Sequence, residues 1–374
     1  MSIRAGFRDE ITRLSRTRFD LALLTIMPAL LLASMAAMIF PGSLSGLKVV
    51  VVDRDGGPLA RAIIRDIEAS PRLELVGVGA QAGPALSAVR RERAQAVLVI
   101  PRDVGTARPG AQPVEILYQA QFLAAGSLTS SYLELAVGEA LADGTAQQAH
   151  LAGLDTVRRA LPGLHVRLLG NPTLSLEWYL GLLLGPGVLH LAIAVTAIGS
   201  AGLLMEDSSF AAFAGRTPSP ARWLIGRMGP HVLAGTLWGV LWFLWLTLAR
   251  GYRLEGSLLI VVAGLLLLFV ATAALGLFLL AATRKTATAL SGAVIVAGSA
   301  LAYSGASLPI NGAPWPAQLW NAVLPLTHYL RLQMDEAMGA ALRPVLVEAG
   351  VLLLYPLLPG AFALWLIARA GRRA

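Results

Sequence analysis

Residues 256–283 read GSLLIVVAGLLLLFVATAALGLFLLAAT, and no charged side chain lies between Glu255 and Arg284. An α-helix rises about 1.5 Å per residue, so ~20 apolar residues are enough to cross the hydrocarbon core of a bilayer. A helix that is apolar on every side has no polar face to turn toward water. The stretch therefore predicts a transmembrane helix.

Five further uncharged runs flank this stretch. They lie between Asp20 and Lys48, between Glu177 and Glu206, between Arg227 and Arg250, after Lys285, and between Glu348 and Arg369. The run after Lys285 is too long for one span, and its second part, residues 309–329, carries four prolines. We expect six transmembrane helices, the fifth followed by an exterior loop, 309–343, with a short re-entrant or interfacial element. Glu348 is expected to start the last span at the exterior surface.

The composition excludes several classes of protein. Of 374 residues, 56% are hydrophobic and only 14% are charged, against about 25% charged in soluble domains. There is no cysteine, which excludes disulfides and thiolate metal sites, and the five histidines are scattered. No G-x-x-x-x-G-K-[ST] phosphate loop, G-x-S-x-G elbow or H-E-x-x-H pair occurs. The chain is predicted to hold no cofactor, and ATP-driven work would need a partner polypeptide.

The basic residues follow membrane topology. Lys and Arg outnumber Asp and Glu by 30 to 22, a net charge of +8. If the N-terminus is cytoplasmic, thirteen basic residues fall in short inside segments and four in short outside loops. The positive-inside rule favours this orientation. Both termini are therefore expected in the cytoplasm, and the charge indicates no nucleic-acid partner.

The first 18 residues are predicted to form a cytoplasmic amphipathic helix. Ile3, Phe7, Ile11 and Leu14 recur at helical spacing among arginines. Such a helix lies in the membrane interface with its apolar side down. The first span, 19–41, follows, and it is too long for a cleaved signal peptide, so we interpret it as an uncleaved anchor.

Residues 42–170 differ in composition from the spans. The pattern predicts strands at 47–52, 73–78, 96–100 and 114–118, and helices at 58–69, 84–93 and 126–150. This β-α-β-α-β-β-α order indicates a small α/β domain. The predicted fold class is thus a membrane all-α protein with six transmembrane helices and an inserted extracytoplasmic α/β domain. Residues 171–374 carry spans two to six.

The cytoplasmic loop 205–222, between spans two and three, is the best candidate for a contact with a partner. A short helical piece with two phenylalanines on one side follows an acidic pair, and two prolines then prevent a helix. Exposed aromatic side chains can anchor such an element in a groove. The alternative is a plain loop whose phenylalanines dip into the interface. The candidate residues are Glu206, Asp207, Phe210, Phe213, Arg216, Pro218 and Pro220.

Nearly the whole chain resembles a permease subunit of the ABC-2 type exporters, in the subgroup with an extracytoplasmic domain after the first span. The resemblance rests on 49-VVVVDRD-55, 96-AVLVIP-101, 171-NP-172 ahead of 178-WY-179, 185-GPG-187, loop 206–220, and 303-YSG-305 followed by 315-WP-316 and 324-LPLTHY-329. The loop departs from the family pattern, with 210-FAAF-213 in place of a threonine–glutamate step, and Arg227 stands where lysine is common.

The resemblance implies an exporter of the bacterial cytoplasmic membrane. Two permease subunits would form the pathway, and separate ATP-binding cassette subunits would bind ATP and act through loop 205–222. Homodimer and heterodimer remain open, as does whether the insert binds substrate or a periplasmic accessory protein. Membrane lipids surround the spans, and their apolar character fits a hydrophobic or amphipathic substrate, a lipid or a drug-like molecule.

Three other classes of membrane protein are alternatives. An ion-coupled secondary transporter or channel would want buried carboxylates or an internal repeat. A membrane enzyme would need clustered polar residues at a span end, and a sensor would not need five spans beyond its anchor. Within the spans, His190 and His231 are the ionisable candidates. His190 is a candidate pathway residue, and for both histidines the alternative is a hydrogen bond between packed helices.

Overall fold

The structure is a computed structural model that describes residues 2–39, 46–91, 93–102, 104, 113–118, 123–151, 175–206, 213, 215, 217–307 and 310–371. The chain divides into two compact units. A helical unit comprises residues 1–40, 169–171 and 177–374, and an α/β unit comprises residues 41–168 and 172–176. Each unit has its own buried apolar core.

Six helical segments of the described residues are long and apolar enough to cross a membrane, which confirms the predicted number. They are Arg18–Ile39, Leu176–Leu204, Pro220–Ala249, Leu258–Thr283, Thr286–Tyr303 and Leu342–Arg369. The first is formed by α2 (Arg18–Leu24) and α3 (Ile26–Ile39), and the second by α7 (Leu176–Glu206). The third is α9 (Pro220–Leu244) with the π-helical turn η3 (Trp245–Ala249), and α10 (Leu258–Thr283) and α11 (Thr286–Tyr303) follow.

The last span begins earlier than predicted. Helix α14 (Leu342–Tyr355) continues through the π-helical turn η4 (Pro356–Gly360) into α15 (Ala361–Gly371). Glu348 therefore lies within α14 rather than at its start. The interpretation of Glu348 as the outer end of the span was wrong because hydropathy treats a charge as a boundary, whereas a neighbouring helix can pair it.

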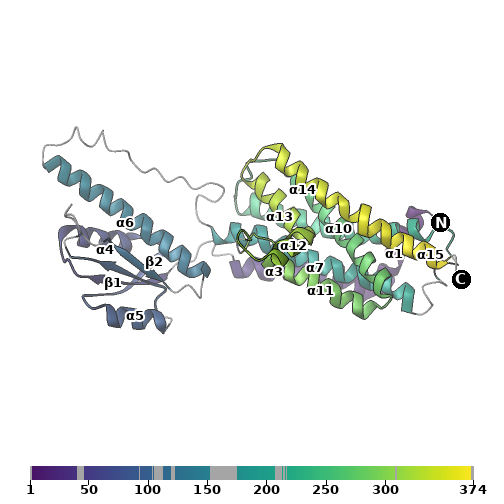
Figure 1. The fold of residues 1–374 in the computed structure, drawn as a ribbon, viewed down its shortest axis with the longest axis horizontal. Coiled ribbons are helices and arrows are strands. Elements are labelled where there is room, and N and C mark those ends of the chain that lie inside the picture. Colours follow the sequence, from purple (N-terminus) through teal and green to yellow (C-terminus); the bar gives the residue numbers. More distant parts are fainter. Residues whose placement is uncertain are drawn as a thin grey trace. The chain divides into compact units, whose positions relative to one another are not determined.

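Loop 309–343 contains two helices, α12 (Trp315–Val323) and α13 (Pro325–Ala337). Ten of the 13 residues of α13 are buried, and α13 packs against α10 and α14. A helix with so much buried surface belongs to the bundle core. Figure 1 shows α12 and α13 at the end of the bundle opposite to α1 (Ile3–Arg16) and α15.

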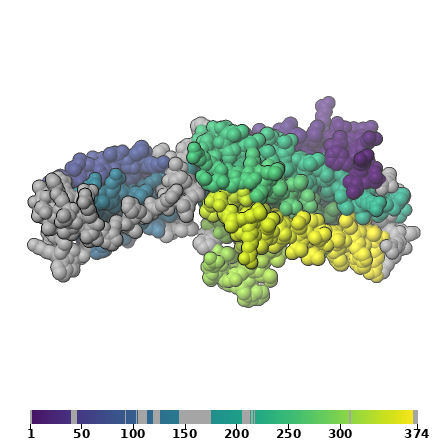
Figure 2. All heavy atoms as spheres, turned by 90° about the horizontal axis from the view of Figure 1, so that it is seen from above, coloured from purple at the N-terminus to yellow at the C-terminus, as the bar shows by residue number. Residues whose placement is uncertain are grey.

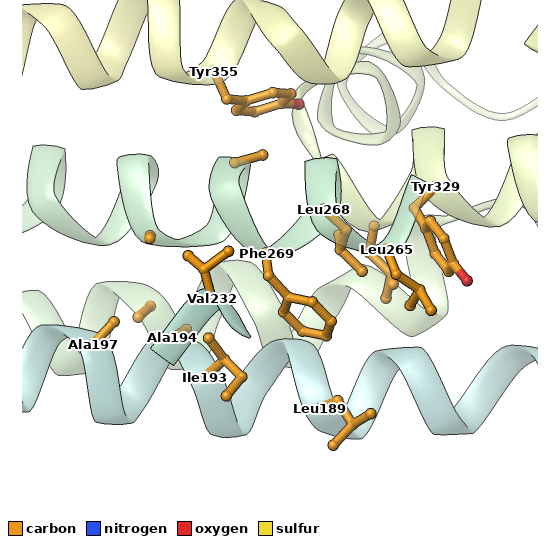
Figure 3. Packing of buried hydrophobic residues seen from close by; sticks show 14 of the residues in the cluster. Leu189, Ile193, Ala194, Ala197, Val232, Leu265, Leu268, Phe269, Tyr329 and Tyr355 are labelled. Atoms are coloured by element: carbon orange, nitrogen blue, oxygen red, sulfur yellow. The ribbon is translucent and has the colours of Figure 1, made fainter. Parts of the chain in front are cut away.

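The core of the helical unit lies between α7, α9, α10 and α13. Phe269 of α10 and Ile193 of α7 are fully buried. Figure 3 shows the Phe269 ring between α10 and α7, close to Ile193 and Val232. Large apolar side chains thus fill the space between helices, as packing at crystal-like density requires.

The α/β unit has the predicted element order. Strands β1 (Leu47–Asp53), β2 (Leu73–Gly79), β3 (Ala96–Ile100) and β4 (Glu115–Tyr118) form one sheet in the order β2-β1-β3-β4. β1 is parallel to β2 and β3, and β4 is antiparallel to β3. Helices α4 (Pro58–Ala69) and α6 (Leu123–Leu151) bury one face, and α5 (Ala82–Arg90) packs on the other. Residues 152–174, which include the predicted end of the insert at residue 170, lie outside the described residues.

The N-terminal helix α1 packs tightly on α9. A Cβ atom on Gly6 would lie 2.0 Å from the Trp223 carbonyl oxygen, and one on Gly226 would lie 1.9 Å from the Ile3 carbonyl oxygen. The two backbones therefore touch where only glycine fits. In Figure 2 the N-terminal segment, in purple, lies on the surface of the bundle. Ile3 and Ile11 remain about half exposed, so the apolar residues of α1 do not all face one environment.

Replacing Gly226 by alanine should separate α1 from α9. A methyl group at this position meets backbone atoms, which cannot rotate away, and overpacking of this kind costs about 1–3 kcal/mol. We expect a lower thermal unfolding midpoint for G226A in detergent. The matched control is G350A, because Gly350 of α14 has no neighbour within 4 Å of the added atom. An equal response of both variants would contradict the close contact.

Candidate coupling interface

The structure describes part of the predicted coupling loop. Glu206 ends α7 and Pro220 begins α9, with Pro218 exposed just before it. Phe213 is half-buried, and its ring centroid lies 5.5 Å from that of Trp223 in α9. This phenylalanine packs on the chain's own helix. Asp207, Phe210 and Arg216, and the side chain of Glu206, lie outside the described residues.

A buried ion-pair cluster lies at the same end of α9. We define the Glu10 cluster as Glu10 of α1 with Arg227 and His231 of α9. Their side chains are 0%, 2% and 1% exposed, respectively. Arg227 Nη2 lies 3.1 Å from Glu10 Oε2, and His231 Nε2 lies 3.0 Å from Glu10 Oε1. One carboxylate of α1 thus meets two basic side chains one turn apart on α9.

Neighbouring polar groups complete the pairing of the Glu10 cluster. Arg13 donates from Nη2 to Glu10 Oε1 at 2.6 Å and also pairs with Asp20 of α2. Arg227 Nη1 donates to Asp9 Oδ2 at 3.0 Å. Acidic and basic groups alternate from α2 through α1 to α9, which is the arrangement that stabilises ion pairs removed from water.

The cluster also reaches α7. Arg227 donates from Nε to the Ser200 hydroxyl at 3.0 Å and from Nη2 to the Ser200 carbonyl at 3.1 Å. His231 Nδ1 lies 3.2 Å from the Thr196 hydroxyl. The guanidinium of Arg227 therefore joins α1, α7 and α9, and its planar set of donors suits this branched contact.

The environment of Glu10 favours its ionised form. Burial alone raises the pKa of a carboxyl, but hydrogen bonds from His231 and Arg13 and the charge of Arg227 outweigh burial and hold the pKa of Glu10 well below its ordinary value of 4.5. Because folding lowers this pKa, ionised Glu10 stabilises the folded chain above pH 4.5, and the contribution declines only at lower pH. The Glu10 carboxyl group is therefore ionised at neutral pH.

A second polar contact joins α7 and α9 at the opposite end of the bundle. Glu177 is fully buried at the start of α7. It accepts hydrogen bonds from Arg250 Nε at 2.7 Å and from the Tyr252 hydroxyl at 2.6 Å. The Tyr252 ring stacks on Trp178 with centroids 5.3 Å apart. Helices α7 and α9 are thus tied at both ends by buried carboxylate or guanidinium contacts.

The two histidines of the spans behave differently. His231 is hydrogen-bonded between packed helices, which confirms the structural interpretation for this residue. His190 of α7 is also buried, but its Nδ1 finds no hydrogen-bond partner among the described residues. An unpaired buried polar atom costs about 1–3 kcal/mol. The role of His190, in the pathway or in helix packing, stays a prediction.

Other chemistry finds no support in the described part of the chain. No group of three or more His, Cys, Asp or Glu side chains is placed to hold a metal ion among the residues that the structure describes. A third buried histidine among the described residues, His328 of α13, pairs with Glu348 of α14 at 2.6 Å and with the Ala322 carbonyl at 2.9 Å. This contact ties helices together at the α13 end.

Comparison with known proteins identifies the family. A family model described as "ABC-2 family transporter protein" matches residues 18–365. The chain belongs to the ABC-2 transporter family. A search of curated proteins found none that matches it. As a family member with six apolar helices, this ABC-2 protein is a multi-pass membrane component of a transporter.

Sequence reasoning missed the Glu10 cluster of this ABC-2 protein. Glu10 stands four residues from Gly6 and from Leu14, so all three share one face of α1. Arg227 and His231 are likewise four residues apart on α9. Two signals were available in the sequence. One is a carboxylate on the same helix face as a glycine and a leucine, and the other is a pair of basic residues at the start of a span. Only the packing of α1 on α9 shows that these two faces meet.

Replacing Arg227 by methionine should strongly destabilise the ABC-2 protein. The variant keeps an apolar stem of similar length but leaves the buried Glu10 carboxylate with fewer partners, and breaking such a pair costs about 3–5 kcal/mol. We expect a large fall in the thermal unfolding midpoint of R227M. Adding E10Q should recover part of the loss because the uncompensated charge disappears. R8Q, which changes an exposed arginine of α1, is the control, and an equal effect of R8Q would refute the role of the cluster.

Proposed function

We propose that this ABC-2 protein is the transmembrane subunit of an ATP-driven exporter. Two permease subunits form the translocation pathway, and separate ATP-binding cassette subunits bind ATP and drive it through loop 205–222. The observation that carries the proposal is the linkage of α7 and α9, the two helices that this loop joins. Polar contacts hold them together at both ends, so a displacement of the loop moves both.

Three contacts support this coupled motion. At the loop end, Arg227 donates to Ser200. Toward the far end, Trp242 Nε1 donates to the Gly181 carbonyl at 2.8 Å. At the far end, Arg250 and Tyr252 bind Glu177. Because close-packed interiors transmit displacement with little compression, a push at the loop reaches the far end of the pair.

The proposed orientation places loop 205–222, α1 and the C-terminal end of α15 on the cytoplasmic side. The α/β unit and α12–α13 are then extracytoplasmic, in a bacterial cytoplasmic membrane. The distribution of basic residues supports this arrangement, with thirteen on the proposed inner side and four in the short outer loops. In this arrangement the Glu10 cluster lies at the cytoplasmic end of α9, beside loop 205–222, on which the ATP-binding cassette subunits would act.

The proposed substrate is hydrophobic or amphipathic, such as a lipid or a drug-like molecule. The apolar packing of the bundle interior supports this class, because the described core between α7, α9 and α10 is built from residues such as Ile193, Val232 and Phe269. The chain itself is proposed to hold no cofactor, since ATP would bind to the partner subunits. The second permease subunit would be another copy or a related chain.

Cysteine labelling tests the orientation with little background, because the chain has no cysteine of its own. We expect E68C, on an exposed turn of α4, to react with a membrane-impermeant maleimide in intact cells. S15C, exposed on α1, should react only after the membrane is permeabilised. Labelling of S15C in intact cells, or protection of E68C, would overturn the orientation and the exporter direction with it.

Coupling is tested with the ATP-binding cassette protein co-expressed and co-purified. We expect vanadate-sensitive ATP hydrolysis and ATP-dependent movement of a fluorescent phospholipid analogue in proteoliposomes. The double variant E177Q/Y252F loosens the far end of the α7–α9 pair, so the amount transported per ATP should fall several-fold while hydrolysis continues. The control is R253Q, which removes the exposed charge of the residue after Tyr252, and it should behave as wild type. An unchanged transport ratio in E177Q/Y252F would count against the linkage.

A further inference from the structure

Helix α7 contains a proline that removes one of its own hydrogen bonds. Pro186 lies inside α7, and proline has no N–H to donate to the carbonyl four residues earlier. That carbonyl belongs to Leu182, which is buried. A carbonyl without a partner inside an apolar bundle is costly, because neither lipid nor water can bind it there. A partner must come from elsewhere in the protein.

The partner is a side chain of α13. Gln333 donates from Nε2 to the Leu182 carbonyl at 2.8 Å, and the Gln333 side chain is 1% exposed. Its Oε1 accepts a hydrogen bond from the Tyr329 hydroxyl at 2.6 Å. Only the amide nitrogen can face a carbonyl oxygen, so these two contacts determine the orientation of the amide. Gln333 thus replaces the bond that proline removed.

The same arrangement occurs independently in the first span. Pro28 of α3 cannot donate to the carbonyl of Leu24, where α2 ends. Trp238 of α9 donates from Nε1 to this carbonyl at 3.1 Å. In both spans a side chain of another helix binds the carbonyl that a proline leaves free. The Gln333 contact is therefore one instance of a repeated solution.

The glycines on either side of Pro186 allow neighbouring helices to approach α7 closely. A Cβ atom on Gly185 would lie 2.2 Å from Trp242 Nε1, and one on Gly187 would lie 2.5 Å from Leu301 Cδ2. Residues of α9 and α11 thus pack on α7 directly beside Pro186. The sequence Gly185-Pro186-Gly187 combines a missing backbone bond with two residues of low helix propensity, which favours bending at this point.

Helix α13 is itself held at both ends. Near its start, His328 pairs with Glu348 of α14. Near its end, Glu336 accepts hydrogen bonds from the backbone N–H of Ser257 at 2.5 Å, through its carboxylate, and of Gly256 at 2.8 Å, through its carbonyl. The carboxylate thus binds at the N-terminus of α10, where negative charge is favourable. Gln333 is presented from a helix that is anchored to α10 and α14.

We propose that Gln333 is a positioning residue for the bend of α7 at Pro186. By binding the Leu182 carbonyl, it sets the angle between the Leu176–Gly185 half of α7 and the half that leads to loop 205–222. Helix α13 thereby controls how a displacement of the loop reaches the far end of the bundle. The part of this inference that concerns transport rests on the proposed function, whereas the hydrogen-bond exchange does not.

A double-mutant cycle on thermal stability tests the exchange without any partner protein. All variants carry Y329F, so that the loss of Gln333 leaves no tyrosine hydroxyl without its acceptor. We expect Q333L to lower the unfolding midpoint by several degrees in the presence of Pro186. In the P186A background the alanine N–H binds the Leu182 carbonyl, so Q333L should have little effect. Equal losses in both backgrounds would overturn the proposal.

Two further variants sharpen the cycle. Y355F removes a side-chain donor to the Val323 carbonyl at 2.7 Å, a contact that involves no proline-freed carbonyl, so its effect should be the same with Pro186 and in the P186A background. W238F should destabilise the protein with Pro28 and much less with P28A. The exchange would not be specific if the midpoint shift caused by Y355F changed with the residue at position 186. The same would follow if the shift caused by W238F were equal with Pro28 and with P28A.

The transport readout separates positioning from stability. P186A/Y329F is expected to be at least as stable as Y329F, because the alanine N–H at position 186 binds the Leu182 carbonyl. Its transported amount per ATP should nevertheless fall severalfold relative to Y329F, because α7 no longer bends at residue 186 and α13 no longer binds the Leu182 carbonyl. Unchanged transport would show that Gln333 serves stability alone. If the wild-type complex shows no ATP-dependent transport, the proposed function fails, while the stability cycle still decides the hydrogen-bond exchange.

Discussion

Polar groups inside an apolar bundle must find their partners within the protein, because lipid offers neither donors nor acceptors. This constraint accounts for the most informative contacts of the structure. The Glu10 carboxylate meets Arg227 and His231, and the carbonyl that Pro186 leaves free meets Gln333. Each such pair joins two helices that are distant in sequence, and together they determine which helices are held together.

The contacts divide the bundle into two groups of helices. Helices α1, α7 and α9 are connected through Arg227, and the same α7–α9 pair is connected again at Glu177. Helix α13 is connected to α14 through His328 and to the start of α10 through Glu336. Gln333 links these two groups at the Leu182 carbonyl of α7, one turn before Pro186. The apolar core between α7, α9 and α10 also joins the two groups. A motion that begins in loop 205–222 would therefore act on the second group through this packing and through the buried amide of Gln333.

The α/β unit was predictable because its pattern is local. Its strands and helices follow one another in contiguous sequence, and turns such as 53-DRDGG-57 mark their ends. The Asp53 carboxylate accepts hydrogen bonds from the backbone N–H groups of Asp55 and Gly56, which builds the turn between β1 and α4 from neighbouring residues alone. The six spans were predictable for a similar reason, since the length and apolar character of each run are properties of consecutive residues.

The number of spans, the order of elements in the insert and the resemblance to the ABC-2 family follow from the amino-acid sequence alone, because each depends on residues that are close along the chain. Helix packing was needed to show that loop 309–343 contains a buried helix, that Glu348 lies within a span, and which polar groups meet. Glu10 and His231 are 221 residues apart, and Gln333 and Leu182 are 151 apart. Hydropathy marks such residues as interruptions in apolar sequence, whereas helix packing supplies the partner that makes each of them compatible with the interior.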